Sequence, residues 1–155
     1  MKKILSLIMC AVLVFSLTAC GSLSEKSSGD TMSLEEIFTS ILKGVDNLPE
    51  LSYTQLNSDN YHYYLFIDPI EGAEALADDA NINAVPHSAV LLRVPEGVDA
   101  LATAAEIEAN ADLNKWICVG AENKIVKVHG RTILLVMSYT ETADQIAENF
   151  DKLWE

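Results

Sequence analysis

The chain has 155 residues, half of them hydrophobic, and a formal net charge of −13 at pH 7. This length suits one domain, and the excess of acids excludes ordinary nucleic-acid binding, which needs Lys and Arg to neutralise phosphates. Without residues 1–19 the chain keeps 8 basic and 23 acidic side chains, a net charge of −15, so the hydrophobic excess is concentrated at the N-terminus.

The N-terminus is typical of an export signal. Lys2 and Lys3 form a basic start, and an apolar run that only two serines interrupt covers residues 4–17. Such a run is marginal for a bilayer core of about 30 Å, which takes about twenty helical residues. Two other interpretations remain open at this point: a buried N-terminal helix, and a signal cleaved after an Ala-x-Ala site.

The residues that close the run, Leu17-Thr18-Ala19-Cys20, resemble the lipobox of a bacterial lipoprotein signal. The resemblance implies cleavage between Ala19 and Cys20 and a diacylglycerol on the Cys20 thiol, with the domain on the extracytoplasmic side of the cell membrane. Two acyl chains hold a soluble domain where one is marginal, since each buried methylene contributes about 0.8 kcal/mol. Cys118 would then be the one free thiol, which excludes an internal disulfide.

Three regions follow from this interpretation: a signal over residues 1–19, the lipidated Cys20 with a flexible tether over 20–32, and a domain over 33–155. Residues 21–31 are rich in Ser and Gly and have no apolar periodicity, as expected of a spacer. Eleven such residues would place the domain about 20 Å from the lipid.

The domain begins with a predicted helix, since Ser33 and Glu36 form a capping box and apolar residues recur at helical spacing over 34–45. Residues 61–67 are dense in aromatic and β-branched side chains and predict a strand. The Ala-rich stretch 72–80 predicts a short helix. Residues 88–94 are apolar on both faces, which is typical of an interior strand, and residues 98–112 predict another helix.

Residues 124–128 and 132–139 predict a β-hairpin around the turn His129-Gly130-Arg131. Thr142 and Gln145 stand at the spacing of a second capping box, which begins a last helix. This mixed order predicts an α+β fold: a single domain with a mainly antiparallel sheet of about four strands, packed by three to four helices.

The segment 84–153 resembles an uncharacterised family of lipoproteins, mostly from clostridia-like Gram-positive bacteria, classed as a domain of unknown function. The similar features are an apolar strand at 89–94 with a following helix, a hairpin at 125–137 around a glycine, and the approach to a terminal helix at 138–150. Ser88 and residues 116–118 depart from the family pattern, which has an acidic residue and a Tyr-x-Pro-like stretch there. The resemblance implies the fold and the location and no activity.

Cys118 with His87 or His129 could form a nucleophile and its base. The apolar neighbours Trp116, Ile117 and Val119 predict instead a buried, inert thiol, because burial without a cationic neighbour raises a thiol pKa. The histidines are far apart in sequence and form no zinc-binding pattern, so we predict no metal ligands.

Carboxylates cluster between Asp68 and Asp79, where a pair could serve acid–base hydrolysis. The residues are Asp68, Glu71, Glu74, Asp78 and Asp79, with Tyr61, Tyr63 and Tyr64 as the nearest aromatic platform.

Asp79 also begins a run, Asp79–Asn83, that resembles the start of an EF-hand loop. Ala84 and Val90 stand where that loop needs Gly and Glu, which leaves at most a weak calcium site. The loop Asn57–Asn60 has a similar composition and the same interpretation.

Charge is unevenly spread along the domain. Residues 46–122 hold fourteen acids against two basic side chains, Arg93 and Lys115. The hairpin that follows is locally basic, with Lys124, Lys127, His129 and Arg131. Its basic groups could contact an acidic partner or lipid headgroups, or they could guard an edge strand against aggregation, which is the interpretation we favour.

These observations together predict a lipid-anchored extracytoplasmic lipoprotein whose domain is a non-catalytic binding module for an envelope protein or a small ligand. We predict no catalytic residues, no cofactor and no nucleic-acid partner; the membrane is reached through the diacylglycerol on Cys20. The alternatives are a small envelope hydrolase that uses carboxylates of the segment Asp68–Asp79, and a weak calcium or ligand sensor.

Overall fold

The computed structural model describes residues 28–155; the predicted signal, Cys20 and the start of the spacer lie outside them. The described chain forms one five-stranded antiparallel sheet in the order β1-β2-β3-β5-β4. The strands are β1 (Leu51–Gln55), β2 (Glu74–Ala80), β3 (Ser88–Arg93), β4 (Asn123–His129) and β5 (Thr132–Ser138). Five helices accompany them over the same residues: α1 (Ser28–Thr31), α2 (Leu34–Ile41), α3 (Tyr61–Leu65), α4 (Ala100–Asn110) and α5 (Thr140–Asp151).

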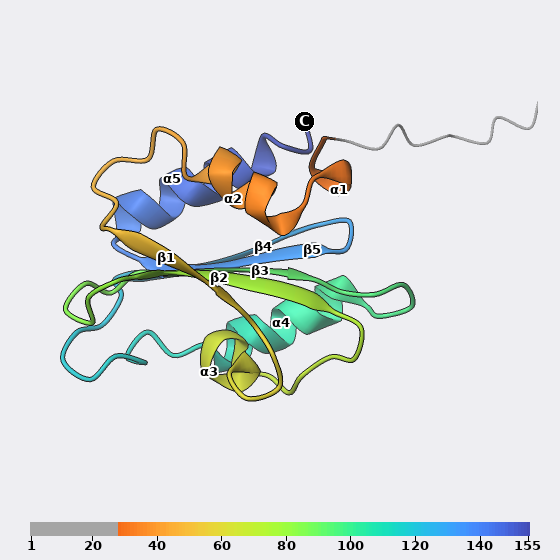
Figure 1. Cartoon of the computed structure of the whole chain (residues 1–155), viewed down its shortest axis with the longest axis horizontal. Helices are drawn as coiled ribbons and strands as arrows, with labels where there is room; N and C mark the ends of the chain where they lie inside the picture. The colour runs from red at the N-terminus through yellow and green to blue at the C-terminus, as the bar shows by residue number, and fades with distance from the viewer. Residues whose placement is uncertain (1–27) are drawn as a thin grey trace, which may run out of the picture.

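Helices cover both faces of the sheet (Figure 1). The helices α1, α2 and α5 lie on one face, and α3 and α4 lie on the other. The predicted α+β fold with a single antiparallel sheet is therefore confirmed, although residues 28–155 contain five strands and five helices where about four strands and three to four helices were expected. None of the helices within residues 28–155 has the length and apolar character that crossing a bilayer takes.

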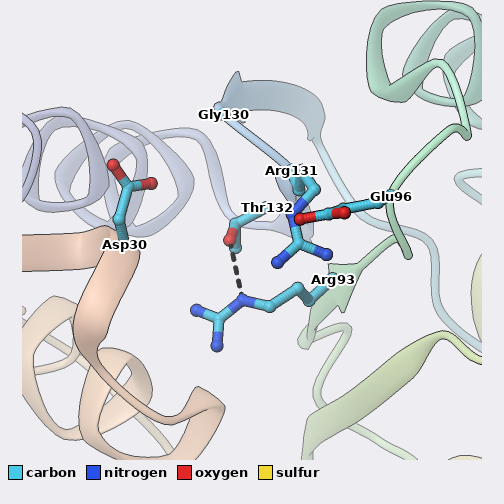
Figure 2. Close-up of a pocket in the computed structure, with 6 residues that line it drawn as sticks. All are labelled: Asp30, Arg93, Glu96, Gly130, Arg131 and Thr132. Atoms are coloured by element: carbon cyan, nitrogen blue, oxygen red, sulfur yellow. Dashed lines mark hydrogen bonds between the residues drawn. The ribbon is translucent and has the colours of Figure 1, made fainter. Parts of the chain in front are cut away.

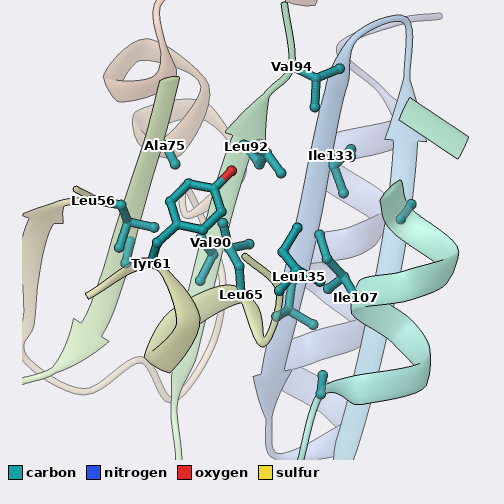
Figure 3. Close-up of a cluster of buried hydrophobic side chains, with 14 of the residues drawn as sticks. Leu56, Tyr61, Leu65, Ala75, Val90, Leu92, Val94, Ile107, Ile133 and Leu135 are labelled. Carbon is teal, nitrogen blue, oxygen red and sulfur yellow. The ribbon is translucent and has the colours of Figure 1, made fainter. Parts of the chain in front are cut away.

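Two apolar clusters fill the spaces between the sheet and its helices. Figure 3 shows the cluster under α3 and α4, where Leu65 and Ile107 meet Val90 and Leu135. On the other face Phe38 of α2 and Phe150 of α5 form a second cluster with side chains of β3 and β5. Each large side chain buried in these two clusters contributes about 1.5–3 kcal/mol to stability. The strand β3 is buried on both faces up to Arg93, which confirms the predicted interior strand.

The first predicted helix is confirmed together with its cap. Ser33 Oγ accepts from the amide of Glu36 at 3.2 Å, while the Glu36 carboxylate accepts from the amide of Ser33 at 2.8 Å. The helix at 98–112 is confirmed as α4, and the predicted hairpin as β4 and β5.

Two neighbouring segments are exchanged relative to prediction. Residues 61–65, expected to be a strand, form the helix α3, which ends where Phe66 adopts a left-handed φ of 60°. Residues 74–80, within the expected helix, form the strand β2 because β1 and β3 pair with it on either side. The strand β1 was not predicted.

The cap predicted for the last helix is also wrong. The N-cap of α5 is Tyr139, and Thr142 lies inside the helix. The side chains of Thr142 and Gln145 contact the backbone of Asp46 instead, at 3.5 and 2.9 Å. The amide of Thr140 donates to Glu122 Oε2 at 3.0 Å, so a carboxylate from another segment caps this helix.

The helix α1 shows that packing begins before Ser33. The Ser28 hydroxyl and the Gly29 amide both donate to the Leu153 carbonyl, at 2.7 and 3.0 Å. Trp154 Nε1 donates to Asp30 Oδ1 at 3.0 Å. The last residues assigned to the flexible tether are therefore part of the folded domain and lie against its C-terminus.

Candidate functional site

A buried ammonium group lies at one end of the sheet. Lys115 comes from the segment between α4 and β4, and its side chain is 3% exposed. Its Nζ donates to Ser88 Oγ, at the start of β3, at 2.7 Å, and lies 3.9 Å from Asp79 Oδ1 of β2. The first contact is a hydrogen bond, and the second is too long to be one.

Three aromatic rings surround the same ammonium group. Lys115 Nζ lies 4.9 Å from the ring centroids of Tyr63 and Tyr64 and 5.2 Å from that of Trp116. These are cation–π distances, and such contacts strengthen when the cation is desolvated. The tyrosines belong to α3 and contact each other edge to face at 5.0 Å. The helix that the sequence did not predict therefore supplies two of the three rings.

A pocket of about 170 Å³ opens beside this ammonium group. Its lining residues are Tyr63, Asn83, Lys115, Trp116 and Ile117. Ile117 is 97% exposed and Tyr63 is half-exposed, so apolar side chains stand at the surface above a buried charge. We call this cavity the Lys115 pocket.

Burial lowers the pKa of the Lys115 ammonium group without removing its charge at neutral pH. Desolvation lowers the pKa of Lys115 to about 8, and the negative charge of Asp79 opposes this shift. Lys115 is consequently still mostly protonated at neutral pH, and it is a cation held in a poorly hydrated environment.

Two serine pairs in the described structure have the residue types of nucleophilic sites, but neither is accessible. Ser88, bonded to Lys115, is completely buried. Ser138 Oγ lies 3.0 Å from His87 Nδ1 on the opposite face of the sheet, and both side chains are about 1% exposed. Burial also lowers the pKa of His87 to about 4. A substrate cannot reach either hydroxyl, so both serines contribute to the packing of the sheet and neither can act as a nucleophile.

The structure separates the residues that the sequence suggested for cysteine chemistry. Cys118 is exposed, so the predicted buried thiol is wrong. His87 pairs with Ser138, while His129 Nε2 lies 2.9 Å from Asp151 Oδ1, so neither imidazole is engaged with the thiol.

The carboxylates of the segment Asp68–Asp79 do not form a facing pair. Asp68 and Glu71 are exposed in the connection before β2, and Glu74 is exposed at its start. Asp78 and Asp79 are neighbours on β2 and therefore project to opposite faces of the sheet. The stretch Asp79–Asn83 covers the end of β2 and the turn after it, and nowhere in residues 28–155 do three His, Cys, Asp or Glu side chains gather as metal ligands.

The basic hairpin is largely neutralised by its own surroundings. Lys124 Nζ donates to the carbonyls of Glu108 and Ala111 at 2.7 Å each, at the C-terminal end of α4, where a cation is favoured. Lys127 and His129 both contact the Asp151 carboxylate of α5, at 2.8 and 2.9 Å. The strand β4 is an edge strand, as the favoured interpretation required.

The chain matches no protein-family model, no curated protein and no solved structure. Its activity must therefore be inferred from its own residues. Among the described residues the Lys115 pocket stands out, because it combines a desolvated charge, aromatic walls and access from the surface. One signal for it was present in the sequence: Lys115 is one of the two basic residues among the fourteen acids of residues 46–122.

Proposed function

We propose that this protein is a lipid-anchored extracytoplasmic lipoprotein whose α+β domain is a non-catalytic binding module. The diacylglycerol on Cys20 holds it at the membrane, and the Lys115 pocket receives a small ligand. The resemblance of Leu17–Cys20 to a lipobox supports the anchor. The geometry around Lys115 supports the binding function.

The observation that carries the binding function is the hydrogen-bonding state of the ammonium group. An ammonium has three donors, and among the described residues Lys115 Nζ makes one hydrogen bond, to Ser88. A ligand oxygen that enters the Lys115 pocket accepts one of the remaining donors. Such a charge-assisted bond is strong because the group is already desolvated.

Binding is favoured over hydrolysis by the arrangement of the reactive groups. Ser88 and Ser138 are buried, and the acids between Asp68 and Asp79 do not face one another across a cavity. A hydrolase needs a nucleophile or a carboxylate pair that reaches a substrate. A single buried cation beneath aromatic walls fixes the orientation of a ligand without attacking it.

The anchor is tested by cell fractionation of two cysteine variants. Cys20→Ala removes the acylated thiol, so the precursor should stay uncleaved and should lack the mass of the lipid. Cys10→Ala is the matched control, because it changes a cysteine of the predicted signal and should leave cleavage and lipidation intact. If Cys20→Ala is cleaved and lipidated as the wild type is, the protein is not anchored through Cys20.

The binding function is tested by native mass spectrometry of protein purified from its own membranes. Wild type should carry a small-molecule adduct that Lys115→Met loses, since methionine keeps the apolar stem and removes every donor. Lys43→Met removes an exposed ammonium group and should keep the adduct. A Lys115→Met protein that retains the adduct would exclude this pocket as the binding site.

A further inference from the structure

A second pocket lies at the opposite end of the sheet, beside α1. It has a volume of about 210 Å³ and lies between α1, the end of β3 and the turn that joins β4 to β5. Figure 2 shows the residues that line it: Asp30, Arg93, Glu96, Gly130, Arg131 and Thr132. We call it the arginine pocket.

Both arginines of this pocket are held by neutral acceptors. Arg93 Nε donates to Thr132 Oγ1 at 3.2 Å, and its Nη2 donates to the Gly29 carbonyl at 3.4 Å. Arg131 Nη1 donates to the Val94 carbonyl at 2.9 Å. Since a guanidinium has five donors, these bonds fix each group in place and leave other donors for a ligand. Both arginines line the same pocket; Figure 2 shows the Arg93 guanidinium extending toward α1 and the Arg131 guanidinium beside Glu96.

The other basic groups of this region have partners of their own. Lys127 and His129 share the carboxylate of Asp151, and Lys124 caps α4. Arg131 is consequently the basic hairpin residue that faces the pocket. It lies there with Arg93. Arg93 and Lys115 are the two basic residues of the range 46–122. Two guanidinium groups that line one pocket on fixed side chains can together bind an anion.

Two acidic residues, Asp30 and Glu96, also line the pocket, on different sides of it. Asp30 Oδ1 accepts from the indole of Trp154, which holds that carboxylate on the α1 side. Glu96 is exposed on the connection after β3 and lies next to Arg131 in Figure 2. Glu96 therefore competes with an incoming anion for the same guanidinium groups.

We propose that the arginine pocket binds a phosphate group. A tetrahedral phosphate offers enough oxygens to bridge two guanidinium groups, whereas a planar carboxylate is satisfied by one bidentate arginine. The phosphate belongs either to a lipid headgroup or to a free phosphate ion, and the two sources share this chemistry.

The position of the pocket favours the headgroup. Asp30 is two residues from Ser28, the eighth residue after Cys20. Eight residues span at most about 29 Å when fully extended, so an anchor at Cys20 keeps Ser28, at the start of α1, within that reach of the bilayer, and the arginine pocket lies beside α1. This choice of source rests on the proposed lipid anchor, while the binding of phosphate does not.

Phosphate binding is tested in solution with the full-length, isotope-labelled protein in detergent, titrated with inorganic phosphate at constant ionic strength. The backbone amides of residues 130–132 should shift in a saturable manner. Arg131→Gln, at an exposed side chain, should weaken binding at least tenfold. Glu96→Gln should tighten it several-fold, because a competing carboxylate is removed. Lys43→Gln changes the net charge as Arg131→Gln does and should have no effect.

Two results would overturn the proposal. One is the lack of any saturable shift at residues 130–132. The other is an equal loss of affinity in Arg131→Gln and Lys43→Gln, which indicates general charge and no site. Arg93→Gln is a weaker probe because Arg93 also holds Thr132, so the exposed Arg131 and Glu96 decide the outcome.

The source of the phosphate is tested in vesicles of phosphatidylcholine and phosphatidylglycerol with brominated acyl chains. Trp116→Phe leaves Trp154 beside the arginine pocket, and Trp154→Phe leaves Trp116 at the opposite end of the sheet. Trp154 should be quenched more strongly, and Arg131→Gln should reduce its quenching. Equal quenching of both tryptophans, with phosphate binding intact, assigns the pocket to free phosphate. If the protein washes off the vesicles, the lipid anchor has failed and the solution titration still decides the pocket.

Discussion

The adjacent acids Asp78 and Asp79 of β2 have opposite environments because side chains alternate along a strand. Asp79 lies on the side of Lys115 and is partly exposed. Asp78 is 1% exposed, and neither of its oxygens has a hydrogen-bond partner among the described residues. Desolvation and the charge of Asp79 raise the pKa of Asp78 to about 7. A buried carboxyl group of this kind is tolerated below about pH 7, where it stays mostly protonated.

Asp78→Asn should stabilise the protein at alkaline pH. The pKa of Asp78 is raised from 3.8 to about 7 on folding, so its protonated form favours the folded state, and stability is lost as pH rises from about 4 to 7. The gain from the amide should be near zero at pH 4 and reach at most a few kcal/mol above pH 7. Urea unfolding of both proteins at pH 4, 6 and 8 measures it.

The comparison must be made between variants, because His87 opposes Asp78. The pKa of His87 is lowered to about 4 by burial, so protonation of this imidazole removes stability as pH falls from about 6.5 to 4. The two slopes partly cancel in the wild type. Asp68→Asn is the control, since it makes the same substitution at an exposed side chain. A pH-independent effect of Asp78→Asn would contradict the prediction.

Cys118 should react with a thiol reagent in the folded protein. Its side chain is exposed, so labelling of native and urea-unfolded protein at pH 8 should proceed at similar rates, within about tenfold. Mass spectrometry of the labelled peptide separates Cys118 from the other cysteines. Strong protection that disappears in urea would show a buried thiol, as the apolar neighbours in the sequence had suggested.

At the level of elements, prediction succeeded where one local signal agreed with the tertiary structure. The capping box at Ser33 and the apolar run of β3 were sufficient alone. Prediction failed at α3 and β2, where propensity and context disagree. Aromatic residues favour strands, yet α3 needs Tyr61 and Leu65 on one face, four residues apart. Alanines favour helices, yet in β2 their small side chains suit a strand buried between two others.

The Lys115 pocket was not predictable for the same reason. Its rings come from α3 and from the segment after α4, and its acid comes from β2. Two of these three elements were misassigned from the sequence, so their juxtaposition could not follow. What the sequence did contain was a contrast in charge, since Lys115 and Arg93 are isolated cations among acids. The tertiary structure places each of them beside a pocket.

The N-terminus of α4 should depend on Asp99. The Asp99 carboxylate accepts from the amides of Leu101 and Ala102 at 3.0 and 3.1 Å, so it satisfies two donors that the helix itself cannot. Asp99→Ala should lower the free energy of unfolding by about 1 kcal/mol, whereas Asp99→Ser should recover most of it. Urea unfolding measures both changes. A serine variant no more stable than the alanine variant would show that capping is not the cause.

At the scale of the domain, the helix α1 packs against the C-terminal residues. The helix α1 hydrogen-bonds to the last residues of the chain, and its Gly29 faces the indole of Trp154. Trp154 in turn stacks on His129 at 5.0 Å and contacts Phe150 at 4.7 Å. The start of the domain, the C-terminus and the β4–β5 hairpin are thereby joined at one end of the sheet. The Lys115 pocket lies at the other end, so an anchor near α1 would leave that pocket facing away from the membrane.

Gly29→Ala should disrupt the packing of α1 against Trp154. A Cβ on residue 29 would overlap the Trp154 ring, so either the indole or α1 must move. Without that contact, alanine would stabilise a helix by up to about 1 kcal/mol relative to glycine. With that contact, overpacking should lower the free energy of unfolding by about 1–3 kcal/mol. The sign of the change in this free energy therefore shows whether α1 packs on Trp154.

Three measurements test Gly29→Ala. The free energy of unfolding should fall, and limited proteolysis near Met32 should become faster. In the Trp116→Phe background, where Trp154 is the remaining tryptophan, its emission should shift to the red. Ser28→Ala is the control, because it removes one hydrogen bond to Leu153 and should leave the indole in place. A Gly29→Ala protein that is more stable than the wild type, with unchanged emission, would mean that α1 does not pack on Trp154. The orientation inferred for the anchored domain would then lose its structural basis.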